Sequence, residues 1–263
     1  MGKALRQLML PFGVVSPSVM ALTAASQAFL AMMLWWCMPS DVIPTPPEVL
    51  SALGRMWMEE GLGRELVTSF ILNLHAIALT VLLSLAMAYL SVIPMFRPIV
   101  TLISKGRFLG LVGLTFLFTL YLKGGHQFKV ALLVFGMTVF YTTSMAAIVV
   151  SIPTDDLDYA RTLRMSRTQL VWNVVVRGTL DDAIEALRQN FAIGWNMLTM
   201  VEGLSRGEGG VGALLLNQNK HFNLDAVFAV QLCILLLGLG MDAVIGWLKN
   251  RACPYAALAT VKG

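Results

Sequence analysis

The chain has 263 residues, of which 57% are hydrophobic and only 13% are charged, and its mean hydropathy is +0.73. This composition excludes a soluble globular protein and indicates an all-α, polytopic membrane protein. The net charge of +4 would suit a nucleic acid or an anionic lipid, but the distribution of the basic residues has a simpler explanation in membrane topology. We therefore expect a lipid bilayer and no nucleic acid as the environment of this chain.

Six apolar segments have about the 20-residue length that is needed to cross a bilayer. They comprise residues 19–38, 66–92, 108–122, 130–152, 183–204 and 224–248. The third is the shortest, and Lys105 and Arg107 precede it. The sequence thus predicts six transmembrane helices.

The basic residues predict how these helices are oriented. With the N-terminus in the cytoplasm, 13 of the 19 lysines and arginines fall on the cytoplasmic side and six fall outside. The positive-inside rule therefore predicts that both termini and residues 153–180 are cytoplasmic. Lys3 and Arg6 resemble the start of a signal peptide, but the apolar run continues through Trp35 and Trp36, which predicts an uncleaved span.

The segment after the first span, residues 41–65, is rich in proline and then becomes helical. Pro44, Pro46 and Pro47 favour an extended start, and apolar residues recur at helical spacing from Val49 to Trp57. Two interpretations fit this pattern equally well. The helix lies at the outer membrane surface, or it packs on the spans of its own chain.

Residues 153–180 form the longest internal stretch without a membrane-grade apolar segment. Their pattern predicts a hairpin of two short helices, the first capped by Thr154 or Asp155 and the second by a capping box of Ser166 and Gln169. We expect the Thr179 hydroxyl to cap the span that follows.

Several polar side chains lie inside the expected spans and are candidates to line a substrate pathway. They are Asn73, His75, Trp195, Asn196 and Glu202. For His75, a hydrogen bond to a neighbouring helix is favoured over substrate contact, whereas for Glu202 substrate contact and capping of the following loop are equally supported. No basic residue is expected deep in a span, which argues against tight anion binding within the pathway.

The sequence offers little for catalysis. It contains no Gly-Lys-Ser/Thr motif, so we do not expect this chain to bind or hydrolyse ATP. Cys37, Cys233 and Cys253 are scattered, which argues against a disulfide framework or a metal site. The acidic clusters at residues 155–158 and 181–185 fit an alternative function, a membrane-embedded magnesium-dependent prenyl or phosphatidyl transferase. Each cluster also lies at a predicted helix start, where the helix dipole favours carboxylates without a metal.

The hairpin resembles the signature of permease subunits of bacterial ATP-binding-cassette (ABC) importers of the nitrate/taurine/sulfonate class. That signature reads Glu-Ala-Ala, three residues, Gly, nine residues, then Ile-x-Leu-Pro. Here Asp158-Tyr159-Ala160 is followed by Arg164 and by residues 174–177. Arg164 replaces the glycine and Arg177 replaces the proline, and a left-handed residue at position 164 would cost about 1 kcal/mol.

Further stretches, in the same order as in that family, extend the resemblance over residues 40–255. They are IPTPPEVLSAL, KGGHQFKVALLVFG, GWNMLTMVEGL, GEGGVGALL and LLGLGMDAVIGWLKNR. The resemblance implies one transmembrane domain over residues 1–263 with the type I importer permease fold, multi-pass in the bacterial inner membrane. It also implies a pathway shared with a second permease copy or paralogue.

The resemblance further implies that the hairpin docks on separate ATPase subunits, which bind the ATP and magnesium that this chain lacks. The residues implied in docking are Leu157, Asp158, Tyr159, Ala160, Arg161, Leu163, Arg164, Met165 and Ser166. A periplasmic or lipid-anchored binding protein would deliver the solute to the outer loops, 41–65 and 205–223, and would hold most of the selectivity. The incomplete signature leaves a non-transporting membrane scaffold as another alternative.

Overall fold

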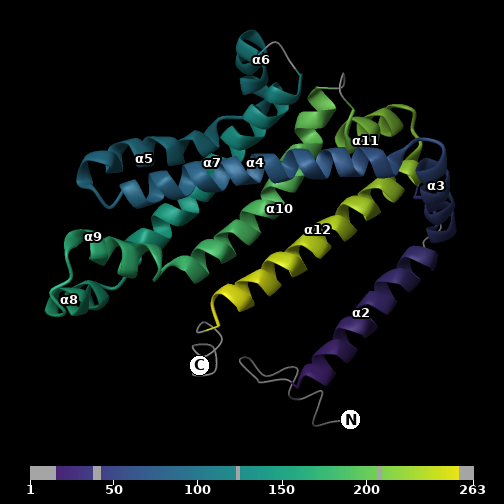
Figure 1. The fold of residues 1–263 in the computed structure, drawn as a ribbon. Helices are drawn as coiled ribbons and strands as arrows, with labels where there is room; N and C mark the ends of the chain where they lie inside the picture. The colour runs from purple at the N-terminus through teal and green to yellow at the C-terminus, as the bar shows by residue number, and fades with distance from the viewer. Residues whose placement is uncertain (1–15, 38–42, 123–124, 206–208, 255–263) are drawn as a thin grey trace.

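Every regular element of the described chain is a helix (Figure 1). The structure is a computed structural model that describes residues 16–37, 43–122, 125–205 and 209–254. No β-strand occurs in these ranges, which confirms the all-α fold. The chain termini, with Lys3, Arg6 and Lys262, lie outside the described residues, so their cytoplasmic placement stays a prediction.

Four helices are long and apolar enough to cross a membrane. They are α2 (Pro17–Cys37), α4 (Leu62–Leu90), α7 (Gly125–Val150) and α12 (Leu224–Ala252), and they correspond to the first, second, fourth and sixth expected spans. The fifth corresponds to α10 (Leu180–Leu204), which has 25 residues. Asp181, Asp182 and several amide side chains make α10 more polar than the other long helices.

The third expected span is broken, so the prediction of one continuous helix over residues 108–122 was wrong. One limb consists of η1 (Pro94–Phe96), α5 (Arg97–Lys105) and η2 (Gly106–Phe108), and the other is α6 (Leu111–Leu122). The two limbs are bent by 110° at the break. With 12 residues, α6 is about 18 Å long, whereas the hydrocarbon core is about 30 Å thick. The two limbs together make a broken span or a re-entrant loop.

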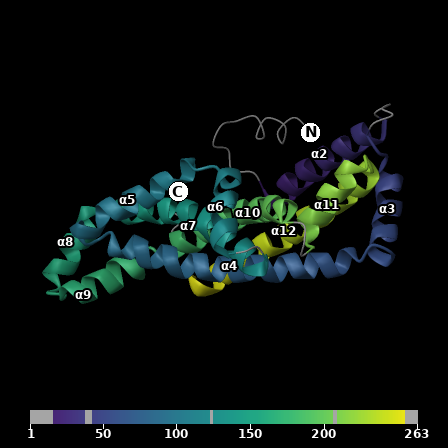
Figure 2. The ribbon, with the colours of Figure 1, turned by 90° about the horizontal axis from the view of Figure 1, so that it is seen from above.

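The core lies where α7 packs between α4 and α10 (Figures 1 and 2). Leu132, Leu133 and Met137 of α7 and Leu198 of α10 are all completely buried. A Cβ on Gly194 would lie 2.5 Å from the Cε atom of Met137, so a larger residue here would displace the buried Met137 side chain at the contact between α10 and α7. The α7 helix therefore fixes the position of α10, the helix that directly follows the hairpin.

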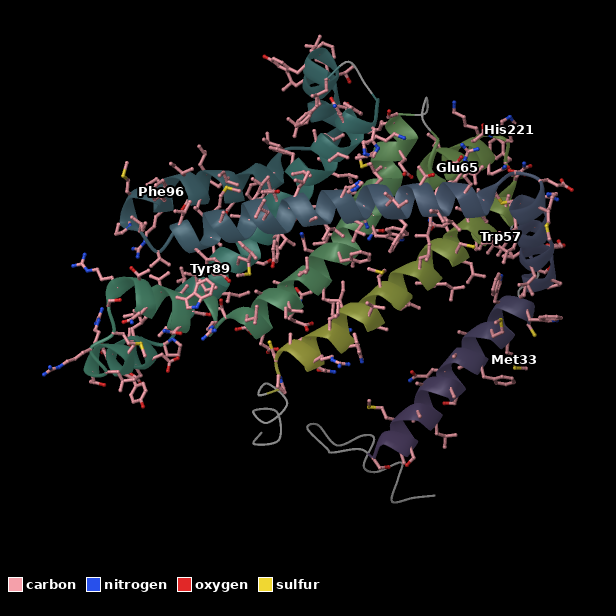
Figure 3. All side chains as sticks on the ribbon, viewed as in Figure 1. Met33, Trp57, Glu65, Tyr89, Phe96 and His221 are labelled. Carbon is pink, nitrogen blue, oxygen red and sulfur yellow. The ribbon has the colours of Figure 1, made fainter. Side chains whose placement is uncertain are left out.

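The first span, α2, stands apart from this core, as Met33 on its surface shows in Figure 3. No residue in its most apolar 18-residue window is buried. Its contact with the rest of the chain is made at one end, where the Trp35 Nε1–H donates to the Pro44 carbonyl oxygen at 3.1 Å and the Trp35 ring stacks on Phe228. Its apolar surface is thus left to lipid or to another chain.

The helix in the 41–65 segment is α3 (Pro46–Met58), and residues 41 and 42 lie outside the described ranges. Glu48 and Thr45 form a capping box at its start. Val49, Ala52 and Met56 are buried against α12 and α4, which is the arrangement expected if the helix packs on its own spans. Leu50, Trp57 and other apolar residues remain exposed on its other side.

The hairpin and α3 lie at opposite ends of the long helices (Figures 1 and 2). The hairpin contains α8 (Thr154–Thr162), α9 (Arg167–Leu170) and the π-helical turn η3 (Val171–Val176). At the other end, α11 (Val211–Lys220) lies near α3. We call these ends the hairpin end and the α11 end.

Candidate functional site

The hairpin turn is built on a left-handed arginine. Arg164 has φ +56°, its N–H donates to the Arg161 carbonyl oxygen at 2.9 Å, and the Met165 N–H donates to the Ala160 carbonyl oxygen at 3.3 Å. These two bonds are those of a Schellman motif, in which glycine normally occupies the left-handed position. The α8 helix therefore ends where the signature predicts. Because the left-handed residue is an arginine and not a glycine, the backbone is strained there.

Capping of the hairpin was predicted correctly for only one of its two helices. At α9 the Ser166 Oγ accepts from the Gln169 N–H at 3.3 Å and the Ser166 N–H donates to Gln169 Oε1 at 2.9 Å, which confirms the capping box. At α8 the N-cap residue is Pro153, which forms no side-chain cap, so the prediction for Thr154 or Asp155 was wrong. An extended proline already sets the entry of the chain into the helix.

The junction between hairpin and α10 also differs from the prediction. The Thr179 hydroxyl donates backward to the Val175 carbonyl oxygen at 2.7 Å and forms no cap for α10, so that expectation was wrong. The Arg177 N–H donates to the Trp172 carbonyl oxygen at 3.0 Å, five residues back. Proline, which the signature has at this position, lacks that N–H. Arg177 therefore permits a π-helical turn after α9, and the short turn at residues 177–179 then leads into α10.

The residues implied in docking divide into two groups. Tyr159 and Leu163 are 68% and 52% exposed, and Arg164 is exposed beside them at the tip. Ala160 is buried, and Leu157 lines a cavity of about 590 Å³ between the hairpin and α5 and α7.

The other residues of this set lie near the tip or on the surface of α8. Arg161 pairs with Asp158 at 2.6 Å on that exposed surface, Met165 is half-buried and Ser166 caps α9. The tip of the hairpin thus exposes apolar side chains together with a cationic one.

At the α11 end, two carboxylates and a hydroxyl bind the first backbone N–H groups before and within α11. Glu202 is completely buried, and its carboxylate accepts from the Ser69 hydroxyl at 2.6 Å and from the Gly212 N–H at 2.8 Å. The Ser69 oxygen in turn accepts from the Val211 N–H at 2.8 Å, and Glu65 accepts from the Gly210 N–H. Figure 3 shows Glu65 of α4 beside α11.

These contacts make Glu202 a cap of the following loop and helix, which was one of the two interpretations left open by the sequence. Lys129 adds a further bond to this cluster, from its Nζ to the Gly209 carbonyl oxygen at 2.9 Å. A Cβ on Gly212 would lie 2.2 Å from the Thr199 carbonyl oxygen, so only glycine fits at the second position of α11. The cluster therefore joins α4, α7, α10 and α11 at one place.

Three further pathway candidates do not lie on the exposed side of α10. Asn73 is 1% exposed on the α4 face that packs on α7 and α10, and neither of its side-chain atoms hydrogen-bonds to a described residue. His75 is exposed on α4, with its ring centroid 6.2 Å from that of His126. Trp195 is also buried, and its Nε1–H donates to the Ile234 carbonyl oxygen at 3.1 Å, which ties α10 to α12.

Asn196 is different, because it lies on a continuous exposed face of α10. This face, which we call the α10 face, consists of Gln189, Ala192, Asn196, Met200 and Leu204. The spacing of three or four residues puts them on one side of a helix. The Asn196 amide donates to the Ala192 carbonyl oxygen of its own helix at 3.0 Å.

Three cavities border the α10 face. The first, of about 410 Å³, lies towards α6 and α7 and includes Arg107 and Asn196. The second, of about 360 Å³, lies towards α12 and includes Arg188, Asn196 and Asp242. The third, of about 680 Å³, lies towards α11 and includes Met200, Asn219 and Gln231. A helix face bordered by hollows with polar groups is suited to line a solute path.

Two of these residues show where sequence reasoning failed. Arg188 lies eight residues into α10, and Arg107 lies at the helix break, so basic side chains do occur away from the helix ends. The break itself was the missed signal. Gly106 and Gly110 lie at the break, but Lys105 and Arg107 beside them were counted among the 13 basic residues on the cytoplasmic side.

Near the hairpin end, ion pairs connect α10 to α12. The Arg188 guanidinium binds Asp242 through two N–H groups and lies 3.7 Å from Glu185. Lys249 lies 3.0 Å from Glu185 and 3.4 Å from Asp181. The described residues hold no group of three or more His, Cys, Asp or Glu side chains placed to bind a metal. Two of the acidic residues proposed for magnesium are thus engaged by Lys249.

The described residues thus form an all-helical membrane bundle with an exposed helical hairpin and a polar helix face. The chain belongs to the family of binding-protein-dependent transport system inner membrane components, whose model matches residues 2–252. This membership confirms the resemblance to ABC importer permeases.

Two individual proteins are similar to this chain. The taurine transport system permease protein TauC of Escherichia coli (strain K12) is 27% identical over 125 residues, which are 45% of this chain and 44% of TauC. The chain therefore matches less than half the length of that relative. A structure of the MetNI methionine ABC transporter in inward-facing conformations has a TM-score of 0.51 at 16% identity, covering 81% of this chain and 99% of the other. That similarity supports the type I importer permease fold.

Proposed function

We propose that this chain is the transmembrane permease subunit of an ATP-driven ABC importer and forms part of the path of a small solute. The observation that carries the proposal is the position of α10. The helix continues from the exposed hairpin, and its open face is bordered by three cavities. A single element thus joins a docking surface to a path.

The hairpin would transmit movement because it is locally rigid. The Schellman motif and the Ser166 capping box fix its turn, and only the three-residue turn at 177–179 separates its π-helical segment from α10. Arg188 and Lys249 then connect α10 to α12. A displacement of the tip by a closing pair of ATPase subunits would therefore rock α10 and α12 together, as in other switching transitions that move packed helices as rigid bodies.

The ATPase activity belongs to partner subunits in this proposal, since the sequence has no phosphate-binding loop. ATP and magnesium would bind there. A second permease copy or a paralogue would cover the α10 face and complete the path, and the unpacked α2 would supply further contact area. A binding protein would dock at the α11 end, on α3 and α11. Because TauC is named for taurine transport, taurine is the first solute to test.

The alternative of a magnesium-dependent transferase has no support from these observations. Asp181 and Glu185 pair with Lys249, and Asp158 pairs with Arg161. These ion pairs engage three of the six carboxylates of the two acidic clusters without a metal. The following experiment distinguishes an importer permease from a membrane scaffold without transport activity.

Replacing Leu163 and Arg164 with aspartate tests the docking role of the tip. We expect the double variant to lose co-purification with the ATPase subunits and binding-protein-stimulated ATP hydrolysis, because Leu163 is 52% exposed and two carboxylates would replace an apolar and a cationic contact. The matched control is Thr168→Asp, an equally exposed addition of charge on α9. Normal co-purification and normal stimulated hydrolysis in the double variant would contradict the proposal.

A further inference from the structure

The helix break places a charged residue halfway along the bundle. A Cβ on Gly106 would lie 3.4 Å from a methyl group of Val139, so η2 packs directly on α7. Val139 is 14 residues from the start of α7 and 11 from its end, or about 21 Å and 16 Å along the helix axis. Arg107, the residue after Gly106, therefore lies at about mid-depth of a membrane helix.

Arg107 has no carboxylate partner among the described residues. Its guanidinium lies 5.1 Å from the centre of the Phe108 ring, and no ion pair of the described chain includes it. Arg188, which lies nearer the hairpin end, binds Asp242 and is close to Glu185. Charged groups at such depth are costly and usually either pair or mark a path for ions or solutes. Arg188 belongs to the first kind and Arg107 to the second.

The cavity beside Arg107 has the composition of an anion site. Its volume is about 410 Å³, within the range of small-molecule sites. Arg107 and Asn196 contribute its polar side chains, the other lining residues are apolar or glycine, and no acidic residue lines it. Asn196 uses one amide N–H on Ala192, and a primary amide has two. The cavity thus offers a positive charge and a further donor without a competing acceptor.

We propose that Arg107 and Asn196 form a contact site for the oxyanion group, carboxylate or sulfonate, of a small solute as it passes along the α10 face. The planar guanidinium donates two parallel N–H groups to such an anion, and the Asn196 amide donates a third. A single arginine also suits passage, since binding in a pathway must be weak enough for release. This site rests on the proposed function, because it requires the α10 face to line a water-accessible path.

The positive charge that Arg107 contributes to this cavity can be tested without knowing the natural solute. The native cysteines are first replaced with alanine, and Met200→Cys is introduced in the same cavity, so that Arg107 and Asn196 stay in place. The full chain, co-expressed with its ATPase subunits, is then treated in membrane vesicles with two methanethiosulfonate reagents of similar size, one carrying a sulfonate and one a trimethylammonium group. The ratio of their reaction rates reports the electrostatic potential at the site.

We expect Arg107→Gln to lower the sulfonate-to-ammonium rate ratio by up to about tenfold, the effect that a unit charge has on two oppositely charged reagents about 6 Å away at the dielectric constant of water. Arg107→Lys should restore most of the ratio. Lys105→Gln, two residues away and outside the cavity lining, is the matched control and should leave it unchanged. An unchanged ratio in Arg107→Gln, or an equal fall in Lys105→Gln, would overturn the proposal. A lack of reaction with both reagents would also overturn it, if it is found for the cysteine at position 200 and for a second variant with a cysteine at position 193, which lines the same cavity.

A second arm uses uptake by the reconstituted importer, with taurine as the sulfonate probe and β-alanine as the carboxylate probe. Arg107→Gln should reduce uptake of whichever probe is carried while ATP hydrolysis persists, and the affected probe identifies the oxyanion. If the wild-type complex neither carries a probe nor hydrolyses ATP in response to a binding protein, the proposed function fails. The rate ratio still decides separately whether Arg107 forms an anion site.

Discussion

The two ends of α10 are held in contrasting ways. At the α11 end, Glu202 and Ser69 are completely buried, and their oxygens bind the backbone N–H groups of Val211 and Gly212. At the hairpin end, the side chains of Arg188 and Asp242 are 37% and 43% exposed. Buried groups with fixed partners are costly to separate, whereas exposed ion pairs exchange partners at little cost. In the proposed transport cycle, this difference predicts that α10 pivots about the α11 end and is displaced most at its hairpin end.

The largest expected effect is from Glu202→Ala, which removes the central acceptor of the α11 end. The Ser69 hydroxyl and the Gly212 N–H would lose their acceptor in a buried place, so we expect a loss of about 3 kcal/mol in the free energy of unfolding. Thermal unfolding of the detergent-solubilised chain measures this loss. The stability of Glu202→Gln, which keeps one carbonyl oxygen, should fall between those of the wild type and Glu202→Ala. A melting temperature equal to that of the wild type would show that the α11 end is not held by this cluster.

Breaking the hairpin-end pair should matter less for stability. We expect Arg188→Gln and Asp242→Asn to cost about 1 kcal/mol or less each, because the pair is more than one third exposed. A double-mutant cycle on thermal unfolding measures their coupling. Transport per ATP hydrolysed should fall in both variants, since α12 would no longer follow α10. Stability losses as large as that of Glu202→Ala would remove the contrast between the two ends.

The smallest expected effect is a gain. Arg164→Gly should relieve about 1 kcal/mol of left-handed strain, partly offset by the greater freedom of glycine in the unfolded chain, for a net gain of about 0.5 kcal/mol. Slower amide hydrogen exchange in the hairpin would report this gain. The control is Arg161→Gly inside α8, where glycine should speed exchange. Faster exchange in Arg164→Gly would show that the arginine side chain stabilises the turn by contacts outweighing the strain.

Local patterns predicted local structure well. Apolar runs predicted the long helices, and the register of the signature placed Arg164 at a left-handed position, where it has φ +56°. The Ser166 capping box was equally local. Thr154 and Thr179 were mispredicted because a hydroxyl competes for several nearby backbone groups, and the Thr179 hydroxyl bonds to Val175 instead.

The features that were not predicted depend on contacts between residues that are far apart in the sequence. Ser69 and Glu202 are separated by 133 positions, and Arg188 and Asp242 by 54, so no local pattern indicated either pair. The helix break was hidden for a related reason. Lys105 and Arg107 have the composition of a loop at the membrane surface, and only the packing of Gly106 on Val139 places them beside the middle of α7.

The central claim, that the α10 face lines a water-filled path, is tested most directly by a cysteine scan of α10. Single cysteines at positions 189, 192, 196 and 200 and at the buried positions 195 and 198 are treated with a water-soluble thiol reagent in membrane vesicles. The account predicts reaction at the first four and none at the last two. A lipid-facing helix would leave all six unreactive, and that result, or reaction at positions 195 and 198 alone, would contradict it.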